Sequence, residues 1–262
     1  MPGVFNRPAW HATIARALTA TTADALAQAL TDAVGHAVTH EGTCIMAFHK
    51  DARPEVLHHT LEPAGAKHYL DRYLAGPYLL DPLYALATGD RKASLCRFRD
   101  ELPDRFRSSE YYRQYCERTH LLDEMDFLAD VTAATTVVLV VGRRHRRFTR
   151  AELERLELIE PTVKAALERI WTLQPSRSGR TDDRVDRSLK RCFERFGEAV
   201  LTERERQVSQ LLLRGHSSKS IARELDIAPG TVMVHKRNLF AKLNIRSQYE
   251  LFSLLIDELG RA

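Results

Sequence analysis

The sequence contains no long hydrophobic run, few cysteines and no apolar block near its N-terminus. Its most apolar stretch, 131–141, is broken by threonine and alanine, and a membrane-spanning helix needs roughly 20 apolar residues. A secretory signal peptide would require an N-terminal apolar block. The four cysteines lie far apart, at Cys44, Cys96, Cys116 and Cys192. We therefore expect a soluble, cytoplasmic protein with reduced thiols and no membrane partner.

Motifs for catalysis are also missing. The sequence shows no nucleophile–base constellation and no phosphate-binding glycine loop, and His58 and His59 lack further ligands at metal-site spacing. No acidic pair follows a first strand, which argues against a phosphorylated receiver domain. We expect no metal, no cofactor and no enzymatic activity. An enzyme with an appended helical domain is the less favoured alternative.

The chain does have the length and the apolar content for two folded domains. It has 262 residues, of which 44% are hydrophobic and 28% charged, and this is an ordinary globular composition. The formal net charge of +4 is compatible with nucleic acid as a partner but is weak evidence by itself.

The first 173 residues predict an α+β domain with an antiparallel sheet and flanking helices. We expect helices over 10–38, 64–74 and 108–118, and strands over 43–49, 56–61, 121–128 and 135–141. The capping box Thr149-x-x-Glu152 then begins an amphipathic helix that ends near Trp171. The arginine-rich segment 143–147 just before it is a solvated hairpin or loop, a site for an anionic ligand, or an additional DNA contact.

A change of composition separates this domain from the rest. Residues 174–183 contain proline, serine, glycine and charge but no large apolar residue, which is typical of a linker. An amphipathic helix over 185–196 follows. We predict an α+β domain at 1–173, a linker and linker helix at 174–197, and an all-α domain of four helices at 198–262.

The helix boundaries of the C-terminal domain are well marked. Capping boxes begin helices at Thr202 and Ser247, Gly215 ends the first helix, and Pro229 suits the first turn of the third. Two short helices joined by a tight turn, followed by basic residues, form a helix-turn-helix arrangement.

The helix after Pro229 has two different faces. Because successive residues turn by about 100°, Val232, Leu239 and Leu243 share one side and must face the core. The opposite side carries Gly230, Val234, Arg237 and Ala241, flanked by Met233 and Asn238. No acidic residue occurs from Pro229 to Arg246. Such a small, apolar and basic surface suits the groove of double-stranded DNA.

This segment resembles the LuxR-type helix-turn-helix. The matching positions are Leu201-Thr202, Arg204-Glu205, Val208, Gly215, Lys219, Ile221-Ala222, Leu225, Thr231-Val232, His235 and Lys242-Leu243. Met233 stands where the family usually has lysine, and Ala228-Pro229 replaces a serine-led turn. These departures affect the expected base preference, not the expected fold.

The resemblance implies a set of residues that contact double-stranded DNA. Met233, Val234 and Arg237, with Asn238 beside them, would meet bases. Contact with phosphates or bracing of the helix is implied for Ser217, Lys219, Thr231, His235 and Lys242. His235 is phased toward the core, so a structural role is as well supported as a DNA contact.

The last helix is apolar over a wide arc formed by Leu251, Phe252, Leu254, Leu255, Ile256 and Leu259. One face can pack on the domain, and the rest would be exposed in a monomer, which suggests a partner helix. In the LuxR-type family the fourth helix is the dimer contact. We therefore expect a homodimer.

The N-terminal domain looks like a GAF- or PAS-type sensor. The segment Tyr69-x-x-x-Tyr73, followed by Asp81-Pro82, is similar to the pocket of autoinducer-binding domains, where an aspartate accepts a hydrogen bond from the ligand amide. Tyr69 stands where that family has tryptophan, and the tyrosine-to-aspartate spacing is one residue short. The alternative is that the tyrosines belong to a helix core and Asp81-Pro82 to a turn or helix start.

The sequence as a whole predicts a dimeric, sequence-specific, DNA-binding transcription regulator controlled by a signal in its N-terminal domain. The signal would be a small-molecule effector of unknown identity. A regulator controlled by a protein partner, without a small ligand, is the alternative.

Overall fold

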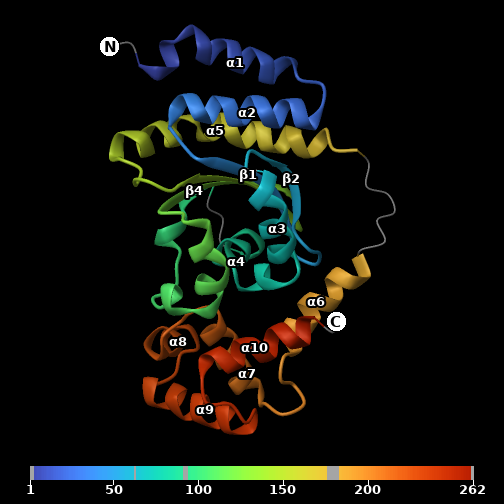
Figure 1. The fold of residues 1–262 in the computed structure, drawn as a ribbon, viewed down its shortest axis with the longest axis vertical. Helices are drawn as coiled ribbons and strands as arrows, with labels where there is room; N and C mark the ends of the chain where they lie inside the picture. The colour runs from blue at the N-terminus through green and yellow to red at the C-terminus, as the bar shows by residue number, and fades with distance from the viewer. Residues whose placement is uncertain (1–2, 62, 91–93, 176–182, 261–262) are drawn as a thin grey trace. The chain divides into compact units, whose positions relative to one another are not determined.

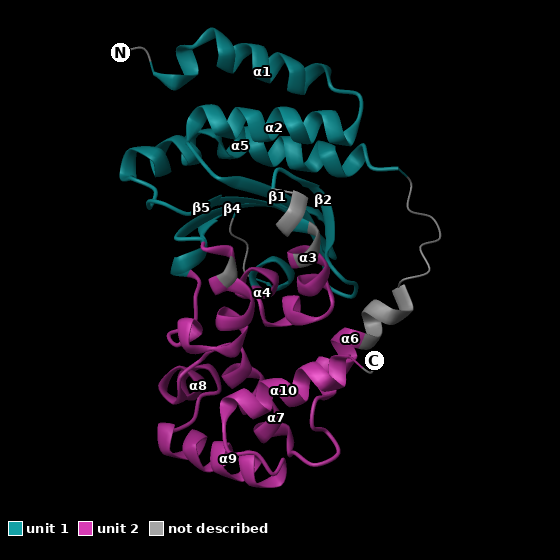
Figure 2. Ribbon diagram, viewed as in Figure 1, with its two compact units in different colours: residues 1–66, 86–100, 121–181 teal, residues 67–85, 101–120, 182–262 magenta. Residues whose placement is uncertain are grey.

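The computed structural model describes residues 3–61, 63–90, 94–175 and 183–260. The chain divides into two compact units (Figure 2), and most of the predicted linker lies outside the described residues. The first unit comprises 1–66, 86–100 and 121–181, and the second comprises 67–85, 101–120 and 182–262. Two short segments of the N-terminal part thus belong to the same unit as the C-terminal helices. Among the described residues, no helix has both the length and the apolarity to cross a membrane.

An antiparallel sheet with strand order β2-β1-β5-β4-β3 forms the centre of the first unit. The strands are β1 (Gly42–His49), β2 (Glu55–His59), β3 (Leu95–Arg97), β4 (Asp123–Thr132) and β5 (Thr135–Arg143). The predicted hairpin and the two later strands are present, whereas the short strand β3 was not predicted. The sheet confirms the predicted fold class of this part.

Helices α2 and α5 pack on one face of this sheet, and α1 packs on α2 as an outer layer (Figure 1). They are α1 (Pro8–Thr19), α2 (Ala23–Ala37) and α5 (Arg150–Thr172). The predicted single helix over 10–38 is two helices, because Thr22 is extended and caps α2 by accepting a hydrogen bond from Ala25 N–H. The apolar stripe of α5 joins the core with Ile45, Phe127 and Leu139, all of them fully buried.

The arginine-rich segment is partly structural. Arg143 is 1% exposed and donates hydrogen bonds to the Thr39 carbonyl and to both carboxylate oxygens of Glu152, at 3.0 and 3.1 Å for the latter. Arg146 contacts the same carboxylate. Hydrogen bonds from Arg143 hold the pKa of Glu152 well below its usual range, against the opposing effect of burial. The buried ion pair between Arg143 and Glu152 therefore stabilises the predicted capping box of α5.

The second unit is helical. Its C-terminal part contains α6 (Asp183–Arg195), α7 (Glu203–Leu213), α8 (Ser218–Glu224), α9 (Pro229–Lys242) and α10 (Gln248–Leu259). Its earlier segments carry the end of α3 (Pro63–Leu74), η2 (Pro77–Leu80), the start of α4 (Pro82–Thr88), η4 (Phe106–Ser108) and the π-helical turn η5 (Tyr112–Cys116). The predicted helix over 108–118 is present in an irregular form, as the π-helix η5 followed by the 3-10 turn η6 (Glu117–Thr119).

Candidate nucleic-acid interface and a buried aspartate cluster

The helix-turn-helix consists of α8 and α9, supported by α7. The capping box of α7 is formed as predicted, with Thr202 and Glu205 bonded reciprocally, and Ser217 caps α8 by accepting a hydrogen bond from Ser220 N–H. Helix α9 packs on α7 and α8 through Val232 and Leu239, which are fully buried. The helical phase predicted for α9 is therefore confirmed at these two positions.

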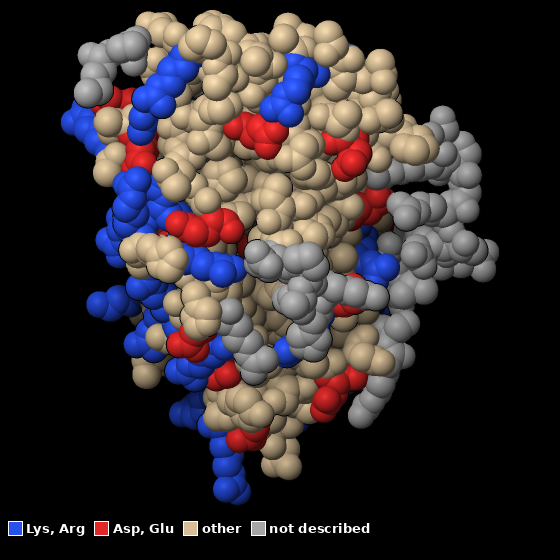
Figure 3. Space-filling model, turned by 45° about the horizontal axis from the view of Figure 1, so that its top comes forward, with Lys and Arg blue, Asp and Glu red and all other residues tan. Residues whose placement is uncertain are grey.

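The opposite face of α9 is open to solvent. Met233 is 64% and Val234 45% exposed. Thr231 and Arg237 are exposed beside them, and Asn238 and His235 are half-buried. Figure 3 shows Lys and Arg side chains protruding from the surface around α8 and α9. This face combines apolar contact groups with a guanidinium, as a groove-binding helix does.

Lys242 has a protein partner. Its Nζ lies 2.7 Å from Oε2 of Glu205, which is the residue that completes the capping box of α7. Burial raises the pKa of Glu205, but hydrogen bonds from Lys242 and Thr202 outweigh it and leave the pKa below its ordinary value. The ion pair connects the end of α9 to the start of α7. Of the two roles implied for Lys242, phosphate contact and bracing of the helix, this geometry supports the second.

The proposed phosphate contacts differ in their surroundings. Lys219 is exposed in the first turn of α8. Ser217, in contrast, donates its N–H to Oδ1 of Asp104 at 2.9 Å and its hydroxyl to Oδ2 of the same carboxylate. Asp104 was not identified from the sequence, because no local pattern connects residues so far apart in the chain.

The predicted ligand residues of the N-terminal part do come together. The Tyr73 hydroxyl donates to Oδ2 of Asp81 at 2.7 Å, and Leu83 N–H donates to Oδ1 at 2.9 Å. Tyr69 stacks on Tyr73, with ring centroids 6.5 Å apart. Burial raises the pKa of Asp81, and hydrogen bonds from Tyr73, Leu83 N–H and Tyr111 offset only part of this rise. Tyr111 is a further residue of this cluster around Asp81, and the sequence did not reveal it.

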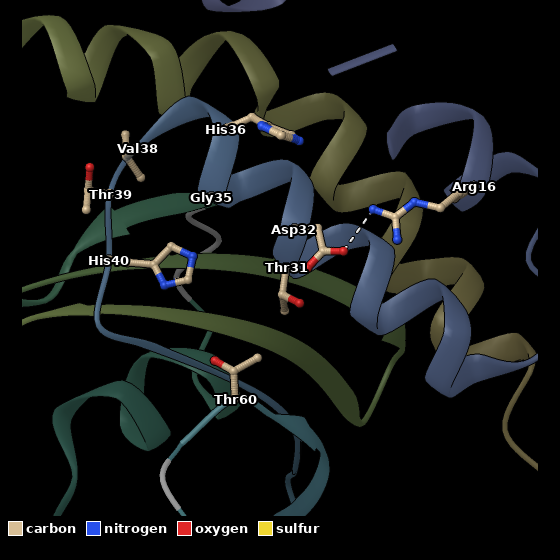
Figure 4. Close-up of a pocket in the computed structure, with 9 residues that line it drawn as sticks. All are labelled: Arg16, Thr31, Asp32, Gly35, His36, Val38, Thr39, His40 and Thr60. Atoms are coloured by element: carbon tan, nitrogen blue, oxygen red, sulfur yellow. Dashed lines mark hydrogen bonds and ion pairs between the residues drawn. The ribbon is translucent and has the colours of Figure 1, made fainter. Parts of the chain in front are cut away.

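An open hollow of about 570 Å³ lies elsewhere, in the first unit (Figure 4). It is lined by Arg16, Thr31, Asp32, Gly35, His36, Val38, Thr39, His40 and Thr60. Arg16 and Asp32 form an ion pair of 2.8 Å across part of it, and burial lowers the pKa of His40. None of the predicted ligand residues is in this lining.

Within the described ranges of the chain, no group of three or more histidine, cysteine, aspartate or glutamate side chains is placed to hold a metal ion.

Comparison with known proteins agrees with this geometry. The family model described as bacterial regulatory proteins, luxR family, matches residues 199–255. A putative HTH-type transcriptional regulator in the exeN 3' region of Aeromonas salmonicida is 36% identical over 157 residues, which cover 57% of this chain and 80% of that protein. The transcriptional regulatory protein UhpA of Escherichia coli is 46% identical over 57 residues, covering 22% of this chain and 29% of UhpA.

Among solved structures, the VqsR LBD domain from Pseudomonas aeruginosa is similar in fold. The TM-score is 0.57 at 23% identity, and the match covers 64% of this chain and 100% of that domain. The likeness supports the α+β fold of the N-terminal part. The expectation of a GAF- or PAS-type domain stays a prediction.

Proposed function

Because the chain belongs to the luxR family of bacterial regulatory proteins, we propose that it is a dimeric, sequence-specific transcription regulator controlled by a signal in its N-terminal part. The observation that carries this proposal is the open face of α9. Met233, Val234 and Arg237 lie there on a helix whose other side is anchored by fully buried Val232 and Leu239. A rigidly held helix with this face fits the major groove of DNA.

Arg237 is proposed to read bases, and Lys219 to contact phosphate. Replacing Arg237 with alanine should cost about 1–3 kcal/mol of binding free energy on a selected duplex and reduce the preference for it over random duplex. Lys219→Ala is the matched control, since a phosphate contact carries no sequence information. It should weaken binding to both duplexes by the same factor.

The measurement is fluorescence anisotropy on a duplex selected from a random pool by the wild-type protein. An equal loss on both duplexes for Arg237→Ala would assign Arg237 to the phosphate backbone and refute base reading. Lys219 is a better control than Lys242, because Lys242 also holds Glu205.

Helix α10 is proposed to form the dimer contact, as the resemblance implies. Only part of its apolar arc is exposed to a partner. Four side chains of the arc are buried within the chain's own fold: Leu251, Phe252, Leu255 and Leu259. Leu254 remains 37% and Tyr249 57% exposed, and Ile256 is half-buried. The apolar stripe of α5 faces the core of the first unit.

Leu254→Glu should leave the circular dichroism spectrum unchanged and shift the protein from dimer to monomer in analytical ultracentrifugation. A glutamate at this position is solvated in the monomer but would be buried without a partner in the dimer. Leu251→Glu is the contrasting variant, and it should unfold the domain, because Leu251 is fully buried. A Leu254→Glu protein that stays dimeric would place the interface outside this part of α10.

The signal is proposed to be a small molecule that binds at Tyr69, Tyr73 and Asp81. The fold shared with the VqsR LBD domain supports this assignment, and so does a buried carboxylate next to aromatic rings. Both Asp81 oxygens already accept hydrogen bonds, so a ligand amide would share an oxygen with one of these donors or replace it. Native mass spectrometry of the purified protein tests the proposal: a retained small molecule supports it, whereas an empty protein that binds another protein favours control by a partner.

A further inference from the structure

A loop of the second unit contacts the turn that joins α7 to α8. Asp104 accepts hydrogen bonds from the N–H and the hydroxyl of Ser217. The next residue, Arg105, donates its N–H to the carbonyl of Gly215 at 3.0 Å. Three hydrogen bonds therefore join the loop to the turn, and two of them use a residue for which the family resemblance implies a phosphate contact.

The fit between loop and turn depends on Gly215. Its φ is +92°, a conformation that favours glycine, and a Cβ built there would lie 2.8 Å from the Phe106 Cα. Phe106 is 2% exposed and its ring packs at 6.0 Å from that of Tyr111, a donor to Asp81. The loop is thus anchored in the cluster where we place the effector.

We propose that Asp104 is an intramolecular competitor of DNA, which holds the two donors of Ser217 that would otherwise bind a backbone phosphate. The inference rests on the proposed DNA-binding function and specifies how it is regulated. Carboxylate and phosphate oxygens both accept hydrogen bonds from an N–H and a hydroxyl, and Ser217 has only this pair to offer. The two acceptors therefore exclude each other.

The negative charge of Asp104 adds to this competition. Burial against the turn raises the pKa of Asp104, but hydrogen bonds from Ser217 lower it by more, so that the carboxylate is ionised at neutral pH. An ionised carboxylate repels a phosphate brought next to it. DNA binding then requires the loop to leave the turn, and an effector that rearranges Asp81 and Tyr111 would act on the loop through Phe106.

The test compares full-length variants on random-sequence duplex DNA, which suffices because a phosphate contact carries no sequence information. Asp104→Asn keeps the shape of the side chain and removes its charge. It should bind about 5- to 150-fold more tightly than wild type, the usual range of a coupling between two sites. Asp100→Asn is the matched control, since this exposed aspartate pairs with its exposed neighbour Arg99. It should change affinity by less than about twofold, as expected for a screened surface charge.

A double-mutant cycle with Ser217→Ala separates competition from general electrostatics. In the Ser217→Ala background, Asp104→Asn should give a smaller gain than in the wild-type background, because the hydroxyl donor is gone while the N–H donor and the charge repulsion remain. A gain of the same size in both backgrounds would overturn the proposal. Wild type and Asp104→Asn binding with equal affinity would also overturn it, while leaving the proposed DNA-binding function intact.

Hydrogen–deuterium exchange tests the contact without DNA. The amides of residues 214–220 should exchange faster in Asp104→Asn than in wild type or in Asp100→Asn. Unchanged exchange would refute the contact in solution. Failure of every variant to bind any duplex, combined with faster exchange in Asp104→Asn, would instead refute the DNA-binding function and confirm the contact.

Discussion

Replacing Glu152 with alanine lowers the free energy of unfolding by about 3–5 kcal/mol, the cost of breaking a buried ion pair from one side. Glu152 is 4% and Arg143 1% exposed. The substitution leaves the Arg143 guanidinium buried without its carboxylate and also removes the reciprocal bond to Thr149 N–H at the start of α5. The loss should appear as a lower midpoint in urea unfolding.

Glu154→Ala is the control on the same helix. Glu154 forms an i,i+4 pair with Arg150, and the side chains of the two residues are 61% and 94% exposed. Such pairs contribute only about 0.3–0.5 kcal/mol. Equal losses for the two variants would show that burial of the Arg143–Glu152 pair adds nothing.

The pH dependence of stability provides a second test of the ion pair formed by Glu152. Its pKa in the folded protein is lowered by Arg143, and a lowered pKa stabilises the fold above the unfolded-state value, about 4.3 for glutamate. The stability difference between wild type and Glu152→Gln should therefore be constant near neutral pH and shrink as pH falls below about 4. A difference that grows in acid would contradict the assigned ion pair.

Raising salt from 50 to 200 mM should weaken DNA binding by a factor of about 10³–10⁵, as expected for a dimer that neutralises 6–10 phosphates. We propose that three exposed basic residues of each subunit make these contacts: Lys219, Arg223 and Arg246. Each neutralised phosphate releases condensed counterions, so the logarithm of the affinity falls linearly with the logarithm of the salt concentration. Titrations of the full-length protein at several salt concentrations measure this slope.

Two lysine variants test which residues contribute to this slope of the logarithm of the affinity against the logarithm of the salt concentration. Lys219→Ala should reduce its magnitude by about 1 for each subunit that contacts DNA, whereas Lys164→Ala, on the exposed face of α5, should leave it unchanged. Affinity that does not depend on salt would contradict the phosphate contacts. A slope reduced equally by both variants would show a general charge effect.

Local rules account for the parts of the fold that the sequence predicted well. The capping boxes at Thr149 and Thr202 involve residues three apart, so their bonds follow from the sequence alone. The phase of α9 was predictable for the same reason, because helical periodicity places Val232 and Leu239 on one side. The break between α1 and α2 was missed, although the threonine at 22 is a good N-cap residue, because an Ala- and Leu-rich pattern continues across it.

Long-range contacts decided the rest. The sequence determined a helix-turn-helix with an open α9 face, an antiparallel α+β part and the grouping of Tyr73 with Asp81, since each depends on periodicity or short spacing. Only the tertiary structure revealed the ion pairs of Arg143 with Glu152 and of Lys242 with Glu205, and the hydrogen bond from Ser217 to Asp104. A charged side chain in a sequence has many available partners, and burial together with chain topology selects one of them. For this reason the contacts with DNA could be proposed from the sequence, whereas the competition proposed for Asp104 could not.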